Sequence, residues 1–339
     1  MTMSRICAAA LAVGLTLCSP ARAEESCGPL KLITVTDMIP DGYGRMTIPV
    51  GIADKPKRLV VDTGAYISSL DADTVAELGL QRVHSAMGIR DILGNVSEYE
   101  AVVPLLTMGR LKTEKVKLFI MPTPGGDHDG PPTTGQAGAD ADVAGLFGSD
   151  FMAVYDVDLD FGAKKFRLVS QDHCEGRVIY WHPANFSAIP FRFDDNHDIV
   201  LPMTLDGHKI KALLDTGADT TTMNGDIAKR IFDLDEGGAK AVVNGEPVAG
   251  AYAHRFQSLE IEGLTISNPV IEILPNVRYS KMGVEESWYW RTHGGDNDYQ
   301  LILGMRQLKQ LHVYIAYKEK MLYISAAGDR DAPPADAAH

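Results

Sequence analysis

This sequence contains two copies of one short motif that begins with an aspartate, and the two carboxyl groups could together catalyse a reaction. Asp-Thr-Gly-Ala at 62–65 recurs 153 residues later at 215–218. A given tetrapeptide occurs by chance only about 0.002 times in a chain of this length, so the repetition is a signal. Two carboxyl groups about 3 Å apart cannot both ionise. If Asp62 and Asp215 meet, one could take a proton from water while the other protonates a carbonyl oxygen. That chemistry hydrolyses amides without a metal ion or a cofactor.

The residues after each aspartate suit the task of holding its carboxyl group in place. We expect the two threonines to form hydrogen bonds across the lobes, and the two glycines to offer backbone N–H groups to the carboxylates. The predicted supporting residues are Thr63, Gly64, Ala65, Thr216, Gly217 and Ala218. A single Asp-Thr-Gly is typical of a tight turn after a buried strand. Two copies in matching context favour a competent dyad.

The sequence around both motifs repeats with the same offset, so we expect the two halves of the chain to have the same fold. Apolar segments at 46–52 and 199–205 precede a second strand that ends at each motif. A short helix is predicted after each motif, with Asp71 and Asn224 as N-caps. Each half then reaches an apolar-apolar-Gly motif followed by two alternating strands. We predict an all-β chain of two lobes related by a pseudo-twofold axis, with short helices.

The chain of 339 residues is long enough for two domains. The predicted lobes occupy residues 24–170 and 188–325, with a linker at 171–187 between them. Residues 326–339 are rich in Ala, Pro and Asp and are predicted to be a disordered tail. Two long loops are expected, at 123–142 and 276–299. The second loop contains Trp288 and Trp290, which either anchor it locally or belong to a substrate or partner surface.

The first 23 residues have the features of a signal peptide. Arg5 supplies a positive charge, residues 6–18 are apolar, and residues 21–23 form an A-x-A cleavage site. A lipid anchor at Cys18 is the alternative, but the bulky Leu17 before it argues against that. We expect export, to a periplasm or out of the cell. No window has 18 consecutive apolar residues, so we expect no membrane span in the mature chain.

Cleavage would leave two cysteines, Cys27 and Cys174. In an oxidising compartment they can form a disulfide, and two free thiols are the alternative. The whole chain has a formal charge of −13. An acidic surface repels phosphate backbones, so nucleic acid is not an expected partner. We expect a monomer that acts on peptides or proteins.

Several other patterns carry no chemistry. Residues 156–162 are similar to a calcium loop, but Gly162 falls one place late and Arg167 stands where Glu is needed. The alternation there predicts a strand with its aspartates facing solvent. The acidic residues of the 123–142 loop are expected to be solvated. No H-x-x-x-H, H-x-H or G-x-S-x-G pattern occurs, so neither a metal site nor a serine hydrolase is expected.

The two Asp-Thr-Gly-Ala motifs, with Leu146-Phe147-Gly148 and Ile302-Leu303-Gly304 behind them, closely resemble the pepsin and retropepsin aspartic peptidases. The resemblance covers residues 31 to 325. It implies a bilobal all-β fold, a catalytic dyad of Asp62 and Asp215, and a β-hairpin flap over the cleft. The flap is expected within 87–99, with turn candidates Gly88, Gly94 and Asn95, and Tyr99 as the candidate flap tyrosine. Its counterpart is expected at 243–251.

The alanine after each glycine is similar to the retroviral type, whereas pepsins usually carry Ser or Thr there. A missing hydroxyl removes a hydrogen bond to the carboxylate, so we predict a less acidic pH optimum than that of pepsin. About 20 residues separate the cleavage site from the first strands, which is too few for a pepsin-like propeptide. The alternative to an active endopeptidase is a bilobal scaffold that binds peptides but cleaves them poorly.

Overall fold

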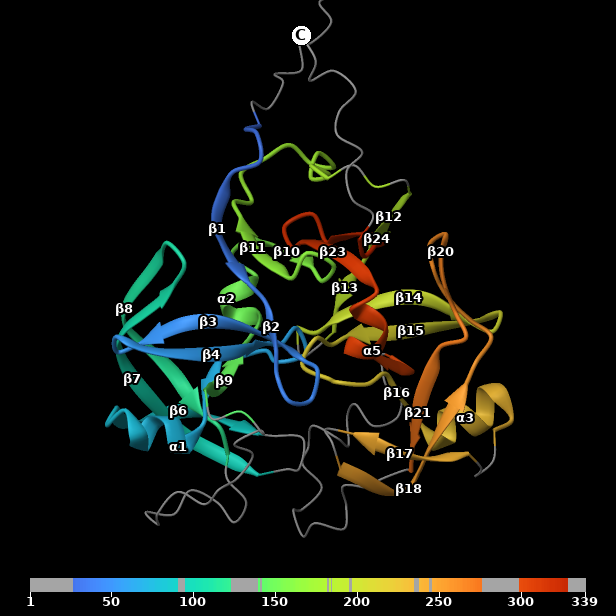
Figure 1. Ribbon diagram of the computed structural model, residues 1–339, viewed down its shortest axis with the longest axis horizontal. Coiled ribbons are helices and arrows are strands. Elements are labelled where there is room, and N and C mark those ends of the chain that lie inside the picture. The colour runs from blue at the N-terminus through green and yellow to red at the C-terminus, as the bar shows by residue number, and fades with distance from the viewer. Residues whose placement is uncertain are drawn as a thin grey trace, which may run out of the picture.

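The computed structural model describes residues 27–90, 95–122, 140, 142–181, 183, 185–194, 197–234, 238–243, 246–275 and 299–328. The predicted signal peptide, Gly94, Trp288 and Trp290 lie outside the described residues, as does 329–339 of the predicted tail. The described part is mostly β-structure, arranged as two lobes side by side with a further sheet at one end (Figure 1). None of its helices is long and apolar enough to cross a membrane.

The first lobe is built on an eight-stranded sheet in the order β2-β3-β4-β9-β5-β8-β7-β6. The strands are β2 (Ile39–Pro40), β3 (Met46–Ile52), β4 (Lys55–Val61), β5 (Ser69–Leu70), β6 (Gln81–Arg90), β7 (Val96–Met108), β8 (Leu111–Ile120) and β9 (Val143–Phe147). The apolar end of β4 is buried and runs parallel to β9. The backbone N–H of Asp62 donates to the carbonyl of Phe147 at 3.0 Å. This pairing places the first apolar-apolar-Gly motif beside the first Asp-Thr-Gly turn.

The second lobe has a ten-stranded sheet with the same central arrangement. The strands are β13 (Arg192–Phe193), β14 (Ile199–Leu205), β15 (His208–Leu214), β16 (Thr222–Asn224), β17 (Ala239–Val243), β18 (Glu246–Arg255), β19 (Ser258–Ile261), β20 (Leu264–Ser267), β21 (Val270–Leu274) and β22 (Leu301–Leu303). Here β15 runs parallel to β22, and the N–H of Asp215 donates to the carbonyl of Leu303 at 3.1 Å. The two aspartates therefore leave equivalent strands in equivalent ways.

Short helices complete each lobe: α1 (Ala72–Glu77), α2 (Ser149–Met152), α3 (Gly225–Phe232) and α5 (Met305–Leu308). The predicted N-caps differ in what they do. The side chain of Asn224 accepts from the N–H of Asp226 at 2.9 Å and so caps α3. Asp71 occupies the cap position of α1 but makes no side-chain capping bond.

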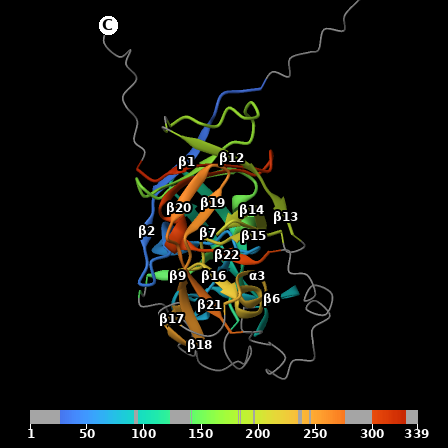
Figure 2. The same ribbon diagram turned by 90° about the vertical axis from the view of Figure 1, so that its right-hand side faces the viewer.

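A six-stranded sheet joins the two halves, in the order β1-β11-β10-β23-β24-β12. Its strands are β1 (Leu32–Asp37), β10 (Asp156–Asp160), β11 (Lys165–Val169), β12 (Phe186–Pro190), β23 (Leu311–Ala316) and β24 (Met321–Ala326). The central pairing of β10 with β23 connects strands from opposite halves of the sequence. β12 begins inside the segment predicted as the linker, and β24 includes the first residue of the predicted tail. Figures 1 and 2 both place this sheet at the end of the molecule opposite the β17–β18 hairpin.

The prediction that the aspartates of β10 face solvent is wrong. Asp156 and Asp158 are 1% and 0% exposed. Each is paired with a histidine: His173 Nε2 lies 2.6 Å from Asp156 Oδ2, and His312 Nε2 lies 2.5 Å from Asp158 Oδ1. Alternating apolar and charged residues usually indicate a strand with one face exposed to solvent, but here residues from outside β10 cover that face as well.

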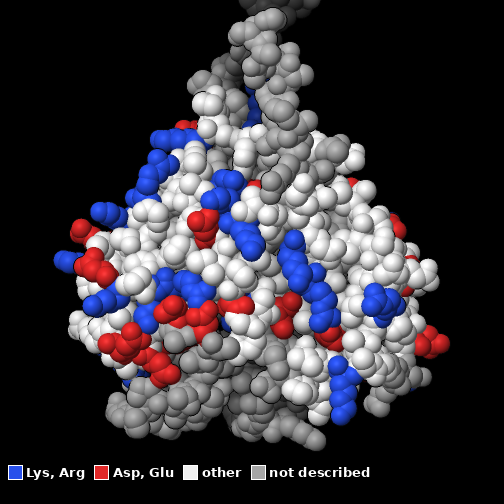
Figure 3. Space-filling model, in the orientation of Figure 1, with Lys and Arg blue, Asp and Glu red and all other residues white. Residues whose placement is uncertain are grey.

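Cys27 and Cys174 form a disulfide across 147 residues of sequence. It ties the start of the described chain to the segment that follows β11. On the face seen in Figure 3, Lys and Arg side chains are interspersed with Asp and Glu. That face therefore presents no uniformly basic surface.

Candidate active site

The carboxyl groups of Asp62 and Asp215 lie close to each other where the two lobes meet, and each influences the pKa of the other. The glycines of the motifs allow this approach. A Cβ on Gly64 would lie 2.7 Å from the Cγ of Asp215, and one on Gly217 would lie 2.3 Å from the Cγ of Asp62. Any side chain at either position would displace the opposite carboxyl group.

Thr63 and Thr216 lock the two turns together through four hydrogen bonds. The hydroxyl of Thr63 donates to the carbonyl of Leu214 at 2.7 Å, and that of Thr216 donates to the carbonyl of Val61 at 2.7 Å. The N–H of each threonine donates to the hydroxyl of the other at 3.0 Å. Both threonines are buried, at 0% and 1% exposure, so these bonds are protected from water. The relative position of the two aspartates is thus held by the backbone of both lobes.

Backbone N–H groups hold each carboxylate within its own turn. Gly64 donates to Asp62 Oδ1 at 3.0 Å, and Gly217 donates to Asp215 Oδ1 at 2.8 Å. The N–H of Ala218 adds a bond of 3.1 Å to the same oxygen of Asp215. All of these donors stabilise the ionised form.

The apolar-apolar-Gly motifs anchor the far side of each turn. The N–H of Gly148 donates to the hydroxyl of Ser68 at 2.8 Å, and that of Gly304 donates to the hydroxyl of Thr221 at 3.0 Å. Ser68 and Thr221 are separated by 153 residues, the same offset as the aspartates. The offset of the repeat pairs these two residues in the sequence, and the structure shows that their hydroxyls support the glycine motifs.

The environment of the pair favours the retention of one proton. Burial raises the pKa of Asp62, although the Gly64 N–H and the positive charge of Arg45 oppose the rise. Burial also raises the pKa of Asp215, and the negative charge of Asp62 raises it further. Two such groups titrate as a unit, so between the two proton losses the pair holds one acid and one base.

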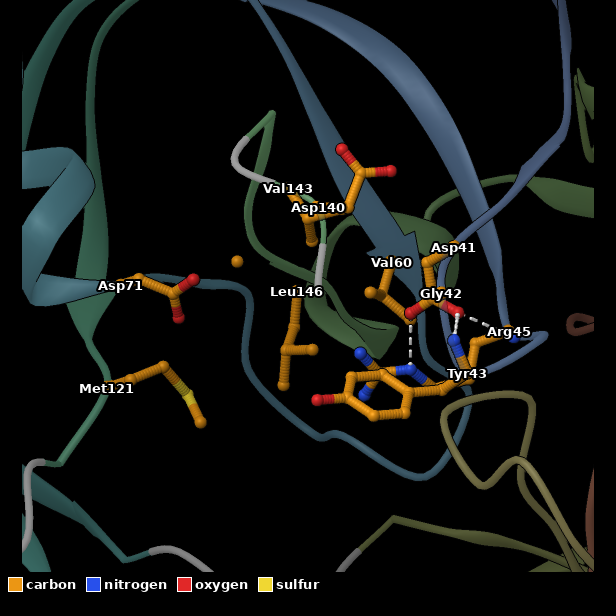
Figure 4. Close-up of a pocket in the computed structure, with 11 residues that line it drawn as sticks. Asp41, Gly42, Tyr43, Arg45, Val60, Asp71, Met121, Asp140, Val143 and Leu146 are labelled. Atoms are coloured by element: carbon orange, nitrogen blue, oxygen red, sulfur yellow. Dashed lines mark hydrogen bonds and ion pairs between the residues drawn. The ribbon is translucent and has the colours of Figure 1, made fainter. Parts of the chain in front are cut away.

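A pocket lies in the first lobe (Figure 4). Its lining residues are Asp41, Gly42, Tyr43, Arg45, Val60, Asp71, Met121, Asp140, Val143, Gly145 and Leu146. The carboxylate of Asp41 accepts from the N–H and the Nε of Arg45, at 2.9 and 2.8 Å. Burial, and then the charge of Asp73, raises the pKa of Asp71 to about 6. The pocket combines apolar walls with charged groups, and one of these, Arg45, acts through its charge on Asp62.

The candidate flap residues lie on the hairpin formed by β6 and β7. Gly88 lies within β6 and not at the turn, whereas Asn95 directly precedes β7. Tyr99 lies in β7, where its ring meets that of His84 at 5.6 Å and the guanidinium of Arg82 at 4.7 Å. The counterpart hairpin of β17 and β18 is also formed, with its turn outside the described residues. In Figure 1 both hairpins lie at the lower end of the view.

Comparison with known proteins decides the family. A sequence profile described as "Aspartyl protease" matches the chain twice, at residues 48–151 and 201–306. The chain belongs to the aspartyl protease family. Each match contains one Asp-Thr-Gly turn and the glycine motif behind it, so the predicted family is confirmed. No curated protein matches the chain.

Solved structures with similar folds come from several sources. Basic 7S globulin from soybean has a TM-score of 0.49 and 10% identity, covering 89% of this chain and all of that one. An aspartic proteinase from Irpex lacteus has a TM-score of 0.48 and 12% identity, covering 90% and 99%. A retropepsin-like aspartic protease from Rickettsia conorii has a TM-score of 0.29 and 19% identity, covering 44% and 98%. The strands and sheets of the described residues themselves show that this aspartyl protease is mostly β and bilobal, as the sequence predicts.

Two charged residues of this protease lie next to the aspartates and were not predicted: Arg45 and Asp198. Both immediately precede a strand, where a charged residue is usually on the surface. In the described part of the chain, no group of three or more His, Cys, Asp or Glu side chains could hold a metal ion.

Proposed function

We propose that this aspartyl protease is an endopeptidase in which Asp62 and Asp215 activate a water molecule. The observation that carries the proposal is the close approach of each carboxyl group to the glycine of the opposite turn, held by a network of hydrogen bonds that crosses both lobes. A water on the dyad gives up a proton to the ionised carboxylate and attacks the peptide carbonyl carbon. The protonated carboxyl group gives its proton to the carbonyl oxygen.

We propose an extended peptide as the substrate. The β6–β7 and β17–β18 hairpins have strands that could form hydrogen bonds with a peptide backbone, and side-chain pockets would then set specificity. The pocket lined by Arg45 and Asp71 is one such subsite. We also propose that the protein is exported, to a periplasm or out of the cell, and acts as a monomer. The Cys27–Cys174 disulfide supports an oxidising compartment.

The test is cleavage of a mixed peptide library by the purified protein across pH 3–8. Asp62→Asn and Asp215→Asn should each abolish cleavage, because each removes half of the acid–base pair. Asp226→Asn, on the exposed first turn of α3, is the matched control and should cleave like the wild type. Folding of all variants is checked by near-UV circular dichroism. A folded wild type that cleaves nothing would favour the peptide-binding scaffold instead.

A transition-state mimic provides a second readout. A pepstatin-like inhibitor resembles the tetrahedral intermediate and should bind the wild type far more tightly than either Asn variant. Equal binding to all three proteins would argue against a dyad at these positions.

A further inference from the structure

Two equivalent turns in the two lobes stand directly beside the aspartates. In the first lobe, the N–H of Asp41 donates to the carbonyl of Arg45 at 2.9 Å, and the N–H of Arg45 donates back to Asp41 Oδ1 at 2.9 Å. In the second lobe, Asp194 and Asp198 make the same two bonds, at 3.1 and 3.0 Å. The offset is again 153 residues. The two turns are therefore the same structure used twice.

The strand register shows what these turns place next to the dyad. Thr47 pairs with Val60 in the β3–β4 ladder. Extending that register by two residues puts Arg45 opposite Asp62. In the β14–β15 ladder Val200 pairs with Leu213, and the same extension puts Asp198 opposite Asp215. Each aspartate thus has one ionisable neighbour at the same relative position: a guanidinium beside Asp62 and a carboxyl group beside Asp215.

Arg45 and Asp198 also differ in their partners: Arg45 has an ion-pair partner, and the carboxyl group of Asp198 has none among the residues described. Arg45 is balanced by Asp41, which it contacts, and its charge acts on both Asp62 and Asp71. Figure 4 shows the Arg45 side chain entering the pocket, with its bond to Asp41.

Asp198 is 8% exposed, and its carboxyl group has no hydrogen-bond or ion-pair partner among the residues described. Burial raises its pKa to about 8, and the charges of Asp194, Asp215 and Asp62 contribute. The ring of Tyr66, four residues after Asp62, stacks on that of the adjacent His197 at 5.0 Å and holds this turn against the first lobe.

Nearly everything else around the two aspartates is symmetric. Each accepts a glycine N–H from its own turn, each is followed by a threonine in the same network, and each turn is backed by the same glycine motif. Further along the turns, Asp219 stands where the first lobe has Tyr66. Directly opposite the aspartates the two sides differ because a positive charge acts on Asp62, and this difference gives the pair a reason to prefer one arrangement of its proton.

We propose that Arg45 and Asp198 polarise the dyad, so that Asp62 is the base that takes a proton from water and Asp215 is the acid that protonates the substrate carbonyl. This inference rests on the proposed function. A cation beside Asp62 stabilises its carboxylate form, whereas Asp198 offers Asp215 no positive charge and, once ionised itself, opposes the loss of its proton. Arg45 and Asp198 are positioning residues, since they act through the aspartates and do not touch the reacting atoms.

The proton inventory closes over one cycle. Asp62 takes one proton from water, the remaining hydroxide oxygen bonds to the carbonyl carbon, and Asp215 gives its proton to the carbonyl oxygen. A gem-diol results, with Asp62 protonated and Asp215 ionised. Asp62 then gives its proton to the amide nitrogen as the C–N bond breaks, and Asp215 removes one from a gem-diol hydroxyl. The products are an acid and an amine, and the starting protonation state is restored.

The first test is the pH profile of kcat/KM. The acid limb reports ionisation of the base, so Arg45→Gln should move it up by about one pH unit, and Arg45→Lys should restore it. Asp198→Asn should leave the acid limb in place and move the alkaline limb down by about half a unit, because an ionising neighbour of Asp215 is lost. Lys55→Gln removes a positive charge at the far end of β4 and should move neither limb. Equal movement of both limbs in either variant, or no movement in either, would overturn the proposal.

The second test does not depend on activity. The surviving aspartate is titrated by 13C NMR of its labelled carboxyl carbon in Asp62→Asn and in Asp215→Asn. Asp62 alone should titrate at least about one pH unit below Asp215 alone. The reverse order, or equal values, refutes the inference even if the protein cleaves peptides. If the expected order appears in a protein that cleaves nothing, the proposed function fails while the charge polarity stands.

Discussion

Replacement of Thr63 by Val should destabilise the protein far more than the small difference in shape between the two side chains suggests. Valine has nearly the same shape as threonine but has no hydroxyl. The change removes the bond donated to the carbonyl of Leu214 and the bond accepted from the N–H of Thr216. Both of those partners are buried, and each unsatisfied group costs about 1–3 kcal/mol. We expect the free energy of unfolding to fall by about 4 kcal/mol.

Thr63→Ser is the matched control, because it keeps the hydroxyl and removes one methyl group. That loss is worth about 1 kcal/mol. Urea denaturation followed by tryptophan fluorescence should therefore place Thr63→Val about 3 kcal/mol below Thr63→Ser. Thr216→Val should behave like Thr63→Val, since its hydroxyl makes the mirrored pair of bonds. If the Val and Ser variants at position 63 differ by less than 1 kcal/mol, the network does not hold the lobes together as argued.

Three further changes have distinct expected outcomes. Gly217→Ala places a methyl group against the carboxyl of Asp62 and should lower kcat/KM at least 100-fold in a peptide assay; near-wild-type activity would contradict the close approach. Cys27→Ser opens a link across 147 residues and should lower the free energy of unfolding by about 3 kcal/mol, a loss that a reducing agent reproduces in the wild type but not in the variant. The raised pKa of Asp71 means that the folded state binds its proton more tightly than the unfolded state does, so this carboxyl costs stability as pH rises from 3.8 through 6. Asp71→Asn should therefore be about 2 kcal/mol more stable than wild type at pH 8 and equal to it at pH 3, as measured by urea denaturation at both pH values.

The parts of the site that sequence predicts are those held by local chemistry. The Asp-Thr-Gly turn follows from an apolar strand, a polar turn and a glycine, and its repetition indicates that the two turns face each other. The threonine and glycine hydrogen bonds of the structure are those expected from the motif. These contacts involve residues within the motif itself, so no knowledge of the wider fold is needed to anticipate them.

The parts that sequence does not predict depend on which strands become neighbours. Asp156 and Asp158 alternate like solvent-facing residues, yet the β10–β23 pairing brings His312 from more than 150 residues away to cover one of them. Gly88 looks like a turn residue, but it lies within β6, in an irregular part of the ladder after which pairing with β7 resumes at Ile89 and Arg90. Periodicity shows how a strand is exposed only when the other strands around it are known.

The positions at which the two halves of the repeat differ are the ones that could assign the acid and base roles of the two aspartates. Where both lobes must do the same mechanical work, the residues match or nearly match: Thr63 with Thr216, and Ser68 with Thr221. A reaction that needs an acid and a base at the same moment cannot be served by two identical carboxyl groups in identical surroundings, because neither arrangement of the shared proton would then be preferred. A symmetric scaffold can supply the preference only through groups outside the motif. The replacement of Arg45 in one lobe by Asp198 at the same place in the other meets that requirement without any change to the turns themselves.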